Sequence, residues 1–205
     1  MDTIFGYKIS NSEYPQMKVI ETPKFMLRPA TPNDAYDLYE YLSQEKVVKY
    51  LPFKPHKNIN TTKKFINSFF INNYRMGKIG HCVIYYKPDK RVIGNIGINN
   101  ISTWSREGEI GICINPKYWG NNFATELTIT TLITGFELMN LDKLIAITYS
   151  ENKYTPKSLE TLGFKYIKTC KPRNNLQVSR IFELTRNDYL KMKRYYLPNL
   201  INTFN

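Results

Sequence analysis

Apolar and polar positions follow two different rhythms along this chain. Short runs in which every second residue is apolar, or in which about four to eight consecutive residues are apolar, are typical of strands. Stretches in which apolar residues recur every three or four positions are typical of helices. This pattern predicts strands at residues 24–29, 81–87, 91–102, 109–115, 144–150, 164–170 and 179–186. It predicts helices at residues 31–44, 60–78, 126–140 and 158–162.

Residues that favour helix ends support these boundaries. Asn33 or Asp34 is suited to start the first helix, and Asn60 or Thr61 is suited to cap the second. Gly77 is suited to end the second helix, because glycine readily adopts the left-handed conformation found after the last turn.

The third helix conflicts with its local composition. Its segment TITTLIT is rich in β-branched residues, which favour strands. We nevertheless predict a helix, because Leu132, Phe136 and Met139 recur at helical spacing and the segment is long.

The predicted elements follow the order strand, two helices, three strands, helix, strand, helix and two strands. Short turns join the middle three strands, which predicts an antiparallel meander. We therefore predict an α+β fold, with a mostly antiparallel, mixed sheet flanked by helices. Nothing in the composition marks a linker, so residues 1–205 are predicted to form a single domain. Residues 1–19 are expected to form an N-terminal arm, and residues 190–205 a C-terminal extension broken at Pro198.

The composition is that of a globular protein. Hydrophobic residues make up 42% of the 205, which excludes disorder of the chain as a whole. No run of about 18 apolar residues predicts a membrane helix, and the first residues lack the pattern of a signal peptide. The three cysteines show no Cys-x-x-Cys spacing and there are only two histidines. We therefore expect a cytoplasmic protein with free thiols, no metal site and no membrane partner.

The charge balance favours anionic partners without choosing among them. The 29 Lys and Arg exceed the 17 Asp and Glu, giving a net charge of +12. Such an excess suits nucleotide-like cofactors, RNA, acidic proteins or acidic lipids. The basic residues are spread along the chain, and no strand face alternates basic and aromatic residues, so we do not expect a nucleic-acid partner. A non-catalytic module that binds anions or RNA is kept as an alternative.

The stretch NPKYWGNNFATE joins a predicted strand to a predicted helix at residues 115–126. Gly120 allows a ligand to approach closely because it has no Cβ. Asn121 and Asn122 belong to the non-glycine residue type that best tolerates positive φ. The first turn of a helix carries N–H groups without acceptors inside the helix, and the helix dipole makes this end partly positive. The stretch therefore predicts a phosphate or pyrophosphate site, with a turn that binds nothing as the alternative.

A second candidate stretch, ENKYTPKSLETLGF, occupies residues 151–164. Asn152 stands at the carboxyl end of an apolar strand, just before a short predicted helix that Gly163 ends. A polar side chain in this place can reach an amide of an extended ligand. The alternative is that Asn152 caps a turn, as such residues often do.

Three ordered motifs give the chain a family resemblance. They are KFMLRPATPNDAYDLYEYLSQEKVVKYLPF, GEIGICINPKYWGNNFATE and ENKYTPKSLETLGF. With these motifs the chain resembles the GCN5-related N-acetyltransferases (GNAT), in particular the ribosomal-protein N-terminal acetyltransferase subgroup of the Rim type. The resemblance runs from about Ile20 to Tyr189, and the spacing from Asn152 to Gly163 and Phe164 matches that of the family.

The central loop matches the subgroup with one departure. The subgroup often shows the pattern Trp-Gly-x-Gly-Tyr-Ala, and here Trp119, Gly120, Phe123 and Ala124 match it. Asn122 stands where the second glycine is usual. Because Asn tolerates positive φ, we expect cofactor binding to survive at a cost of about 1 kcal/mol.

The resemblance implies that two central strands splay apart and that acetyl-CoA, as co-substrate, binds in the gap. Its pantetheine arm would pair with strand backbone like an added strand, and its pyrophosphate would bind the loop amides. The residues expected to bind acetyl-CoA are Ile112, Cys113, Ile114, Trp119, Gly120, Asn121, Asn122, Phe123, Ala124, Thr125 and Asn152.

The resemblance also implies direct acyl transfer to an amine. Only a neutral amine attacks a thioester, so a base must remove a proton, directly or through water. Glu109 matches the glutamate often found at this strand in the subgroup and is the expected base, with Glu107 as the alternative. A backbone N–H near Cys113 or Ile114 would stabilise the oxyanion.

The proton donor for the leaving thiolate is less well defined. Many family members have a tyrosine seven residues after the asparagine that corresponds to Asn152, but Leu159 stands there in this chain. Ser158 is the favoured substitute, and Thr155 or Tyr149 are alternatives.

The acceptor is expected to be a protein N-terminal amine, as the subgroup name suggests, with polyamines and aminoglycosides as alternatives. Tyr50, Phe53 and His56 are candidates to line the acceptor side. A fold that has lost turnover is a third possibility, because Asn122 and Leu159 depart from the family pattern. A monomer or a homodimer is expected.

Overall fold

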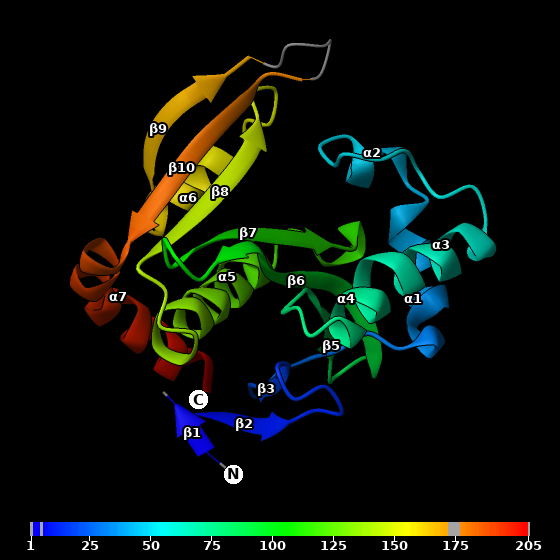
Figure 1. Cartoon of the computed structure of the whole chain (residues 1–205), viewed down its shortest axis with the longest axis horizontal. Helices are drawn as coiled ribbons and strands as arrows, with labels where there is room; N and C mark the ends of the chain where they lie inside the picture. The colour runs from blue at the N-terminus through cyan, green and yellow to red at the C-terminus, as the bar shows by residue number, and fades with distance from the viewer. Residues whose placement is uncertain (1, 5, 172–176, 205) are drawn as a thin grey trace. The chain divides into compact units, whose positions relative to one another are not determined.

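The computed structural model describes residues 2–4, 6–171 and 177–204. The chain folds into two compact units (Figure 1). Unit 1 comprises residues 1–97 and 112–124, and unit 2 comprises residues 98–111 and 125–205. The strands β6 (Arg91–Ser102) and β7 (Glu107–Ile114) each contribute residues to both units.

Unit 1 is built on an antiparallel sheet in which each strand pairs with the next one along the chain. Its strands are β1 (Asp2–Ile4), β2 (Tyr7–Asn11), β3 (Lys18–Glu21), β4 (Phe25–Arg28), β5 (Cys82–Tyr86) and the first part of β6. Buried residues alternate along β2 and β4, as in Tyr7 and Ile9 or Phe25 and Leu27, which is the strand period. The predicted strands at 24–29, 81–87 and 91–102 are confirmed. The range 1–19, which was expected to form an N-terminal arm, includes β1, β2 and the first residues of β3.

Helices complete unit 1 and supply much of its core. They are η1 (Pro32–Asp34), α1 (Ala35–Leu42), α2 (Glu45–Val48), α3 (Ile59–Phe65), the π-helix η2 (Ile66–Ile71), α4 (Asn72–Arg75) and η3 (Pro116–Tyr118). Leu38 and Tyr41 of α1 and Phe70 of η2 are fully buried, and α1 packs against α3. Gly77, at φ 72°, follows the last turn as predicted.

The cap of the second predicted helix was placed two or three residues too late. Asn58 caps α3, because its side-chain oxygen accepts the N–H of Thr61 at 3.0 Å. Both Asn58 and Asn60 are suitable cap residues, so the sequence pattern alone did not distinguish them.

Unit 2 contains the parallel pairing of the fold. β7 pairs in parallel with β8 (Lys143–Tyr149), from Glu107 opposite Lys143 to Ile110 opposite Ala146. β8 pairs antiparallel with β10 (Ser179–Thr185), and β10 pairs antiparallel with β9 (Lys165–Cys170). These strands confirm the predicted α+β class with a mostly antiparallel, mixed sheet.

The long helix of unit 2 forms despite its β-branched residues. It comprises α5 (Phe123–Ile133) and the π-helix η4 (Thr134–Leu138), so it begins three residues before the predicted start. The hydroxyls of Thr130, Thr131 and Thr134 each donate to the carbonyl oxygen four residues earlier, at 2.9 to 3.0 Å. These bonds satisfy the threonine hydroxyls inside the helix.

Two further helices of unit 2 differ from what the sequence pattern predicts. α6 (Thr155–Thr161) begins three residues before Ser158, with Pro156 in its first turn. It packs against β8 and β9 (Figure 1). α7 (Arg186–Phe204) continues through Pro198, where the sequence predicted a break.

Candidate functional site

The junction between β7 and α5 starts at a buried asparagine. Asn115 has 0% exposure and follows the last residue of β7. Its backbone N–H donates to the carbonyl oxygen of Ile93 in β6 at 2.7 Å, and its side-chain oxygen accepts the N–H of Lys117 at 3.1 Å. Both bonds fix the direction in which the chain leaves the strand.

Two residues in the left-handed region then bend the loop. Gly120 has φ 82° and Asn122 has φ 58°, whereas Asn121 does not adopt positive φ. All three are exposed, and a Cβ added at Gly120 would meet no atom within 4 Å. α5 begins at Phe123 directly after this bend, so the N–H groups of its first turn, which lack acceptors within the helix, lie next to an open surface. This geometry suits the predicted pyrophosphate site.

Aromatic side chains fasten the loop on both sides of the bend. The indole N–H of Trp119 donates to the carbonyl oxygen of Ile114 at 2.9 Å. The Phe123 ring packs against the rings of Phe25 and Tyr86, with centroids 5.0 and 5.1 Å apart. The bend at Gly120 and Asn122 is therefore held between two anchored aromatic residues.

Backbone groups of β7 point alternately toward β6 and toward the opposite edge of the strand. A Cβ added at Gly94 of β6 would come within 2.3 Å of the carbonyl oxygen of Cys113, so Cys113 faces β6. Because backbone groups alternate along a strand, those of Ile112 and Ile114 point to the opposite edge. Both residues follow Ile110, the last residue of β7 that pairs with β8. The Ile114 carbonyl oxygen accepts the indole N–H of Trp119.

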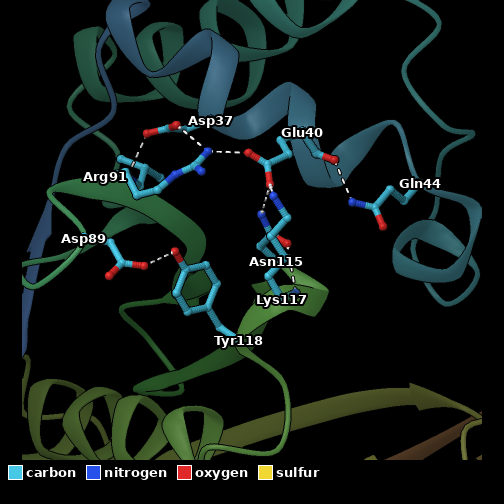
Figure 2. A network of polar contacts seen from close by, with 9 residues as sticks. Asp37, Glu40, Gln44, Asp89, Arg91, Asn115, Lys117 and Tyr118 are labelled. Atoms are coloured by element: carbon cyan, nitrogen blue, oxygen red, sulfur yellow. Dashed lines mark hydrogen bonds and ion pairs between the residues drawn. The ribbon is translucent and has the colours of Figure 1, made fainter.

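A polar network supports the loop from α1 (Figure 2). Asn115 Nδ2 donates to Glu40 Oε1 at 3.2 Å, and Lys117 Nζ lies 2.7 Å from the same oxygen. Arg91 forms a close ion pair with Glu40 Oε2 and a second pair with Asp37 at 2.8 Å. Burial opposes ionisation of Glu40, but the hydrogen bonds from Lys117, Asn115 and Arg91 outweigh it and lower its pKa to about 2.

A second contact fixes the same loop. The Tyr118 hydroxyl donates to Asp89 Oδ2 at 2.5 Å (Figure 2). Burial and this bond raise the pKa of Tyr118 to about 12. Neither Glu40 nor Asp89 was singled out from the sequence, because no local pattern reveals a contact between residues so far apart along the chain.

The two candidate bases of β7 have different partners in unit 2. Glu109 accepts a hydrogen bond from the Asn100 amide at 2.9 Å. Glu107 is paired with Lys143 at 2.9 Å, and Lys143 also lies 3.4 Å from Glu183. The hydrogen bond that Lys143 donates to Glu107 is the main reason why the pKa of Lys143 is raised. Because the Glu107 carboxylate is engaged by a lysine and the Glu109 carboxylate by a neutral amide, Glu109 stays the favoured candidate base.

Asn152 acts as a cap within unit 2. Its Oδ1 accepts the N–H groups of Tyr154 and Thr155, both at 3.1 Å, and its Nδ2 donates to Thr155 Oγ1 at 2.8 Å. These bonds match the alternative considered for Asn152 and start α6. Ser158 is exposed on α6, Leu159 is buried, and Tyr149 is half-buried at the end of β8.

The three candidate acceptor residues differ in accessibility. Tyr50 and Phe53 are half-buried, whereas His56 is only 6% exposed. His56 Nδ1 lies 2.9 Å from Thr62 Oγ1, and burial lowers its pKa. His56 is therefore held neutral inside unit 1, and Tyr50 and Phe53 are better placed to meet an acceptor.

The described residues also bear on metal binding and on membrane insertion. They contain no cluster of three or more His, Cys, Asp or Glu side chains arranged to hold a metal ion. None of the helices that they form has the length and apolar character needed to cross a membrane.

Known proteins resemble this chain over most of its length. The family model of the acetyltransferase (GNAT) domain matches residues 24–165. YoaA of Bacillus subtilis, an uncharacterized N-acetyltransferase, is 26% identical over 147 residues, which are 72% of this chain and 82% of the relative.

Two solved structures share the fold at lower identity. A ribosomal-protein-S5-alanine acetyltransferase from Vibrio fischeri is 17% identical, with a TM-score of 0.70 over 83% of this chain and 98% of that one. A mutant spermidine N-acetyltransferase from Vibrio cholerae is 19% identical, with a TM-score of 0.67 over 84% of this chain and 99% of that one. The names of these two proteins indicate different acetyl acceptors, a ribosomal protein and spermidine. The shared fold therefore does not identify the acceptor of this chain.

Proposed function

Because the chain belongs to the GNAT acetyltransferase family, we propose that it transfers an acetyl group from acetyl-CoA directly to a protein N-terminal amine. That it is a GNAT acetyltransferase follows from the family match and the related structures. Acetyl-CoA is the co-substrate of this family. The protein acceptor, the Rim-type subgroup and the residue roles below are our proposals.

The observation that carries acetyl-CoA binding is the bend at Gly120 and Asn122. Its left-handed residues, the open space beside Gly120 and the start of α5 at Phe123 place the N–H groups of the first helical turn next to an open surface. These N–H groups suit a diphosphate, since N–H donors and the helix dipole both favour negative charge. The exposed Ala124 and the half-buried Thr125 belong to this first turn.

We assign the chemical roles to residues of β7 and α6. Glu109 accepts the proton of the acceptor ammonium, directly or through water, so that the neutral amine attacks the thioester carbonyl. The N–H of Ile114, on the edge of β7 that faces away from β6, stabilises the oxyanion that forms. Ser158, exposed on α6, is the proposed proton donor to the leaving thiolate.

Charge near the candidate acceptor residues favours a peptide over a polyamine. Residues 45–64 contain one acidic residue, Glu45, and a group of exposed lysines. These lysines are Lys46, Lys49, Lys54, Lys57, Lys63 and Lys64. A polycation would be repelled by this segment, whereas an N-terminal amine followed by neutral or acidic residues would not.

The proposed function is tested in two steps. Calorimetric titration of the protein with acetyl-CoA first shows whether the donor binds. Acetylated products are then measured by mass spectrometry for N-terminal peptides with neutral, acidic or basic second residues, and for spermidine and an aminoglycoside. We expect acetylation of peptides, with the basic ones slowest. Turnover of spermidine or the aminoglycoside alone would replace the acceptor assignment, binding without any turnover would indicate an inactive fold, and no binding would favour the anion- or RNA-binding alternative.

A further inference from the structure

Glu40 contacts several segments of unit 1 but has no role in the proposed chemical step. It lies on α1, and its carboxylate contacts two residues of the loop between β7 and α5, Asn115 and Lys117, and one residue at the start of β6, Arg91. The contact with Asn115 spans 75 residues of sequence. One side chain thus ties three separate segments of the unit together (Figure 2).

Two of the residues that Glu40 contacts, Asn115 and Lys117, lie just before the bend at Gly120 in the sequence. Asn115 is fully buried and also accepts the N–H of Lys117. The Glu40 carboxylate accepts a hydrogen bond from the Asn115 amide. It therefore helps to fix the direction in which Lys117 and the following residues continue from β7. The Glu40 carboxylate thus links the residues before the bend at Gly120 to α1.

The neighbours of Glu40 on either side along the chain, Asp37 and Gln44, also form hydrogen bonds. Asp37, one helical turn earlier, binds Arg91 at 2.8 Å and accepts the N–H of Val92 at 2.8 Å. Gln44, one turn later, donates to the Glu40 carbonyl oxygen at 2.7 Å. The Glu40 side chain is 27% exposed, so its charge is partly desolvated and its ion pairs are stronger than those on an open surface.

We propose that Glu40 is a positioning residue for the acetyl-CoA-binding loop, acting through Asn115 and Lys117. This inference rests on the proposed function, because the loop must bind acetyl-CoA for its position to matter. Glu40 does not contact the reacting atoms in this role. Removing its charge should therefore weaken binding of the donor while leaving the chemical step nearly unchanged once the donor is bound.

The test compares Glu40→Gln with a matched control, Glu21→Gln. Glu21 forms an ion pair with Lys87 at 3.0 Å, and its side chain is similarly accessible, at 32%. Both variants are titrated with acetyl-CoA and assayed with the best acceptor peptide. We expect Glu40→Gln to raise the Kd and the KM for acetyl-CoA about five- to 20-fold, as loss of a charged hydrogen-bond partner implies, with kcat within about two-fold of the unchanged protein. We expect Glu21→Gln to change neither value.

A double-variant comparison separates positioning from general weakening of the fold. Lys117→Met should raise the Kd in the unchanged protein, but should add little in the Glu40→Gln background, since coupled residues are not additive. Hydrogen–deuterium exchange should accelerate at residues 115–122 in Glu40→Gln and not in Glu21→Gln. Because Lys117 is 67% exposed, its variant is expected to fold even if Glu40→Gln does not.

The outcomes distinguish the inference from the function on which it rests. If the unchanged protein does not bind acetyl-CoA, the proposed function fails. If it binds and either Glu40→Gln or Lys117→Met binds equally well, the positioning role is wrong and the proposed function stands. A Glu40→Gln protein that keeps its KM but loses kcat would also overturn the role, because the effect would then lie in the chemical step.

Discussion

The indole N–H of Trp119 donates a 2.9 Å hydrogen bond to the carbonyl oxygen of Ile114, five positions earlier in the chain. This bond folds the loop back onto the end of β7. The Trp119 side chain is 53% exposed, and Lys46 Nζ lies 6.0 Å from its ring centroid. The ring of Trp119 is therefore partly exposed at the surface, directly before Gly120 in the chain.

Replacement of Trp119 by phenylalanine should distinguish the contribution of the aromatic ring from that of the indole hydrogen bond. The variant keeps an aromatic ring but loses the donor, which is expected to lower the free energy of unfolding by about 1 kcal/mol. It should also raise the Kd for acetyl-CoA, because the loop is less firmly held. Urea denaturation and calorimetry measure the two effects. Trp104→Phe is the control, since Trp104 is 95% exposed and should change neither value; an unaltered Kd in Trp119→Phe would contradict the prediction.

The left-handed conformation of Asn122 gives a second prediction. A residue with a Cβ is strained at φ 58°, and alanine lacks the short polar side chain that eases this strain in asparagine. Asn122→Ala should therefore destabilise the protein by about 1 kcal/mol, whereas Asn122→Gly should be nearly neutral and should preserve acetyl-CoA binding. Thermal unfolding with and without acetyl-CoA measures both. Asn121→Ala, at a residue without positive φ, should have little effect, and equal losses at the two positions would argue against the assignment.

Local signals in the sequence were sufficient for most elements of the fold. Gly77 marks a helix end because glycine suits positive φ, and the alternation of Phe25 and Leu27 marks a strand. The helix through TITTLIT was predicted from apolar spacing, and the structure adds the reason why it tolerates its threonines, namely their bonds to the preceding turn.

Other features depended on contacts that no local pattern contains. Strand β4 pairs with β5, which lies far later along the chain, and β1 to β3 extend the other edge of β4 as successive hairpins. The site showed the same limit. The loop at Gly120 was recognised from its residues, but the carboxylate of Glu40 that supports it lies on a distant helix and resembles any other surface glutamate in the sequence.

Glu109 and Glu107 should respond differently to loss of charge. In Glu109→Gln the side chain can still accept the hydrogen bond of Asn100, so the fold and the Kd for acetyl-CoA should be retained. Loss of the base should lower kcat about 10²- to 10⁴-fold. Glu107→Gln removes the ion pair with Lys143, so it should lower stability slightly and leave kcat nearly unchanged. A pH–rate profile of both variants checks the assignment, and a full rate in Glu109→Gln across the profile would remove it.

Asn152 can be tested for two roles at once. Asn152→Ala removes the acceptor for the N–H groups of Tyr154 and Thr155 and should cost about 1 kcal/mol of stability. Asn152→Ser retains a capping oxygen but lacks the amide donor, so its stability should be close to normal. If Asn152 also donates to acetyl-CoA, as the family resemblance implies, the Kd should rise in both variants. Normal binding by Asn152→Ser would leave Asn152 as a cap only.

His81 is one of the two histidines of the chain, and its ring is buried. Its Nδ1 lies 2.9 Å from the amide nitrogen of Asn95, whose oxygen accepts the Tyr41 hydroxyl at 2.9 Å. Burial lowers the pKa of His81 from 6.5 to about 4. Between these two values the unfolded chain binds a proton that the folded chain does not, so stability is full above about pH 6.5 and falls as the pH is lowered.

The slope of stability against pH therefore reports the state of His81. One such group contributes at most about 1.4 kcal/mol per pH unit. His81→Gln should be less stable near pH 7, because it disturbs a buried contact, but its stability should fall less steeply between about pH 6.5 and pH 5. His56→Gln serves as the comparison, since burial lowers the pKa of His56 as well and its share of the slope is measured in the same way. Urea titrations at several pH values give these slopes, and a His81→Gln protein with the slope of the unchanged chain would show that His81 is not held neutral by the fold.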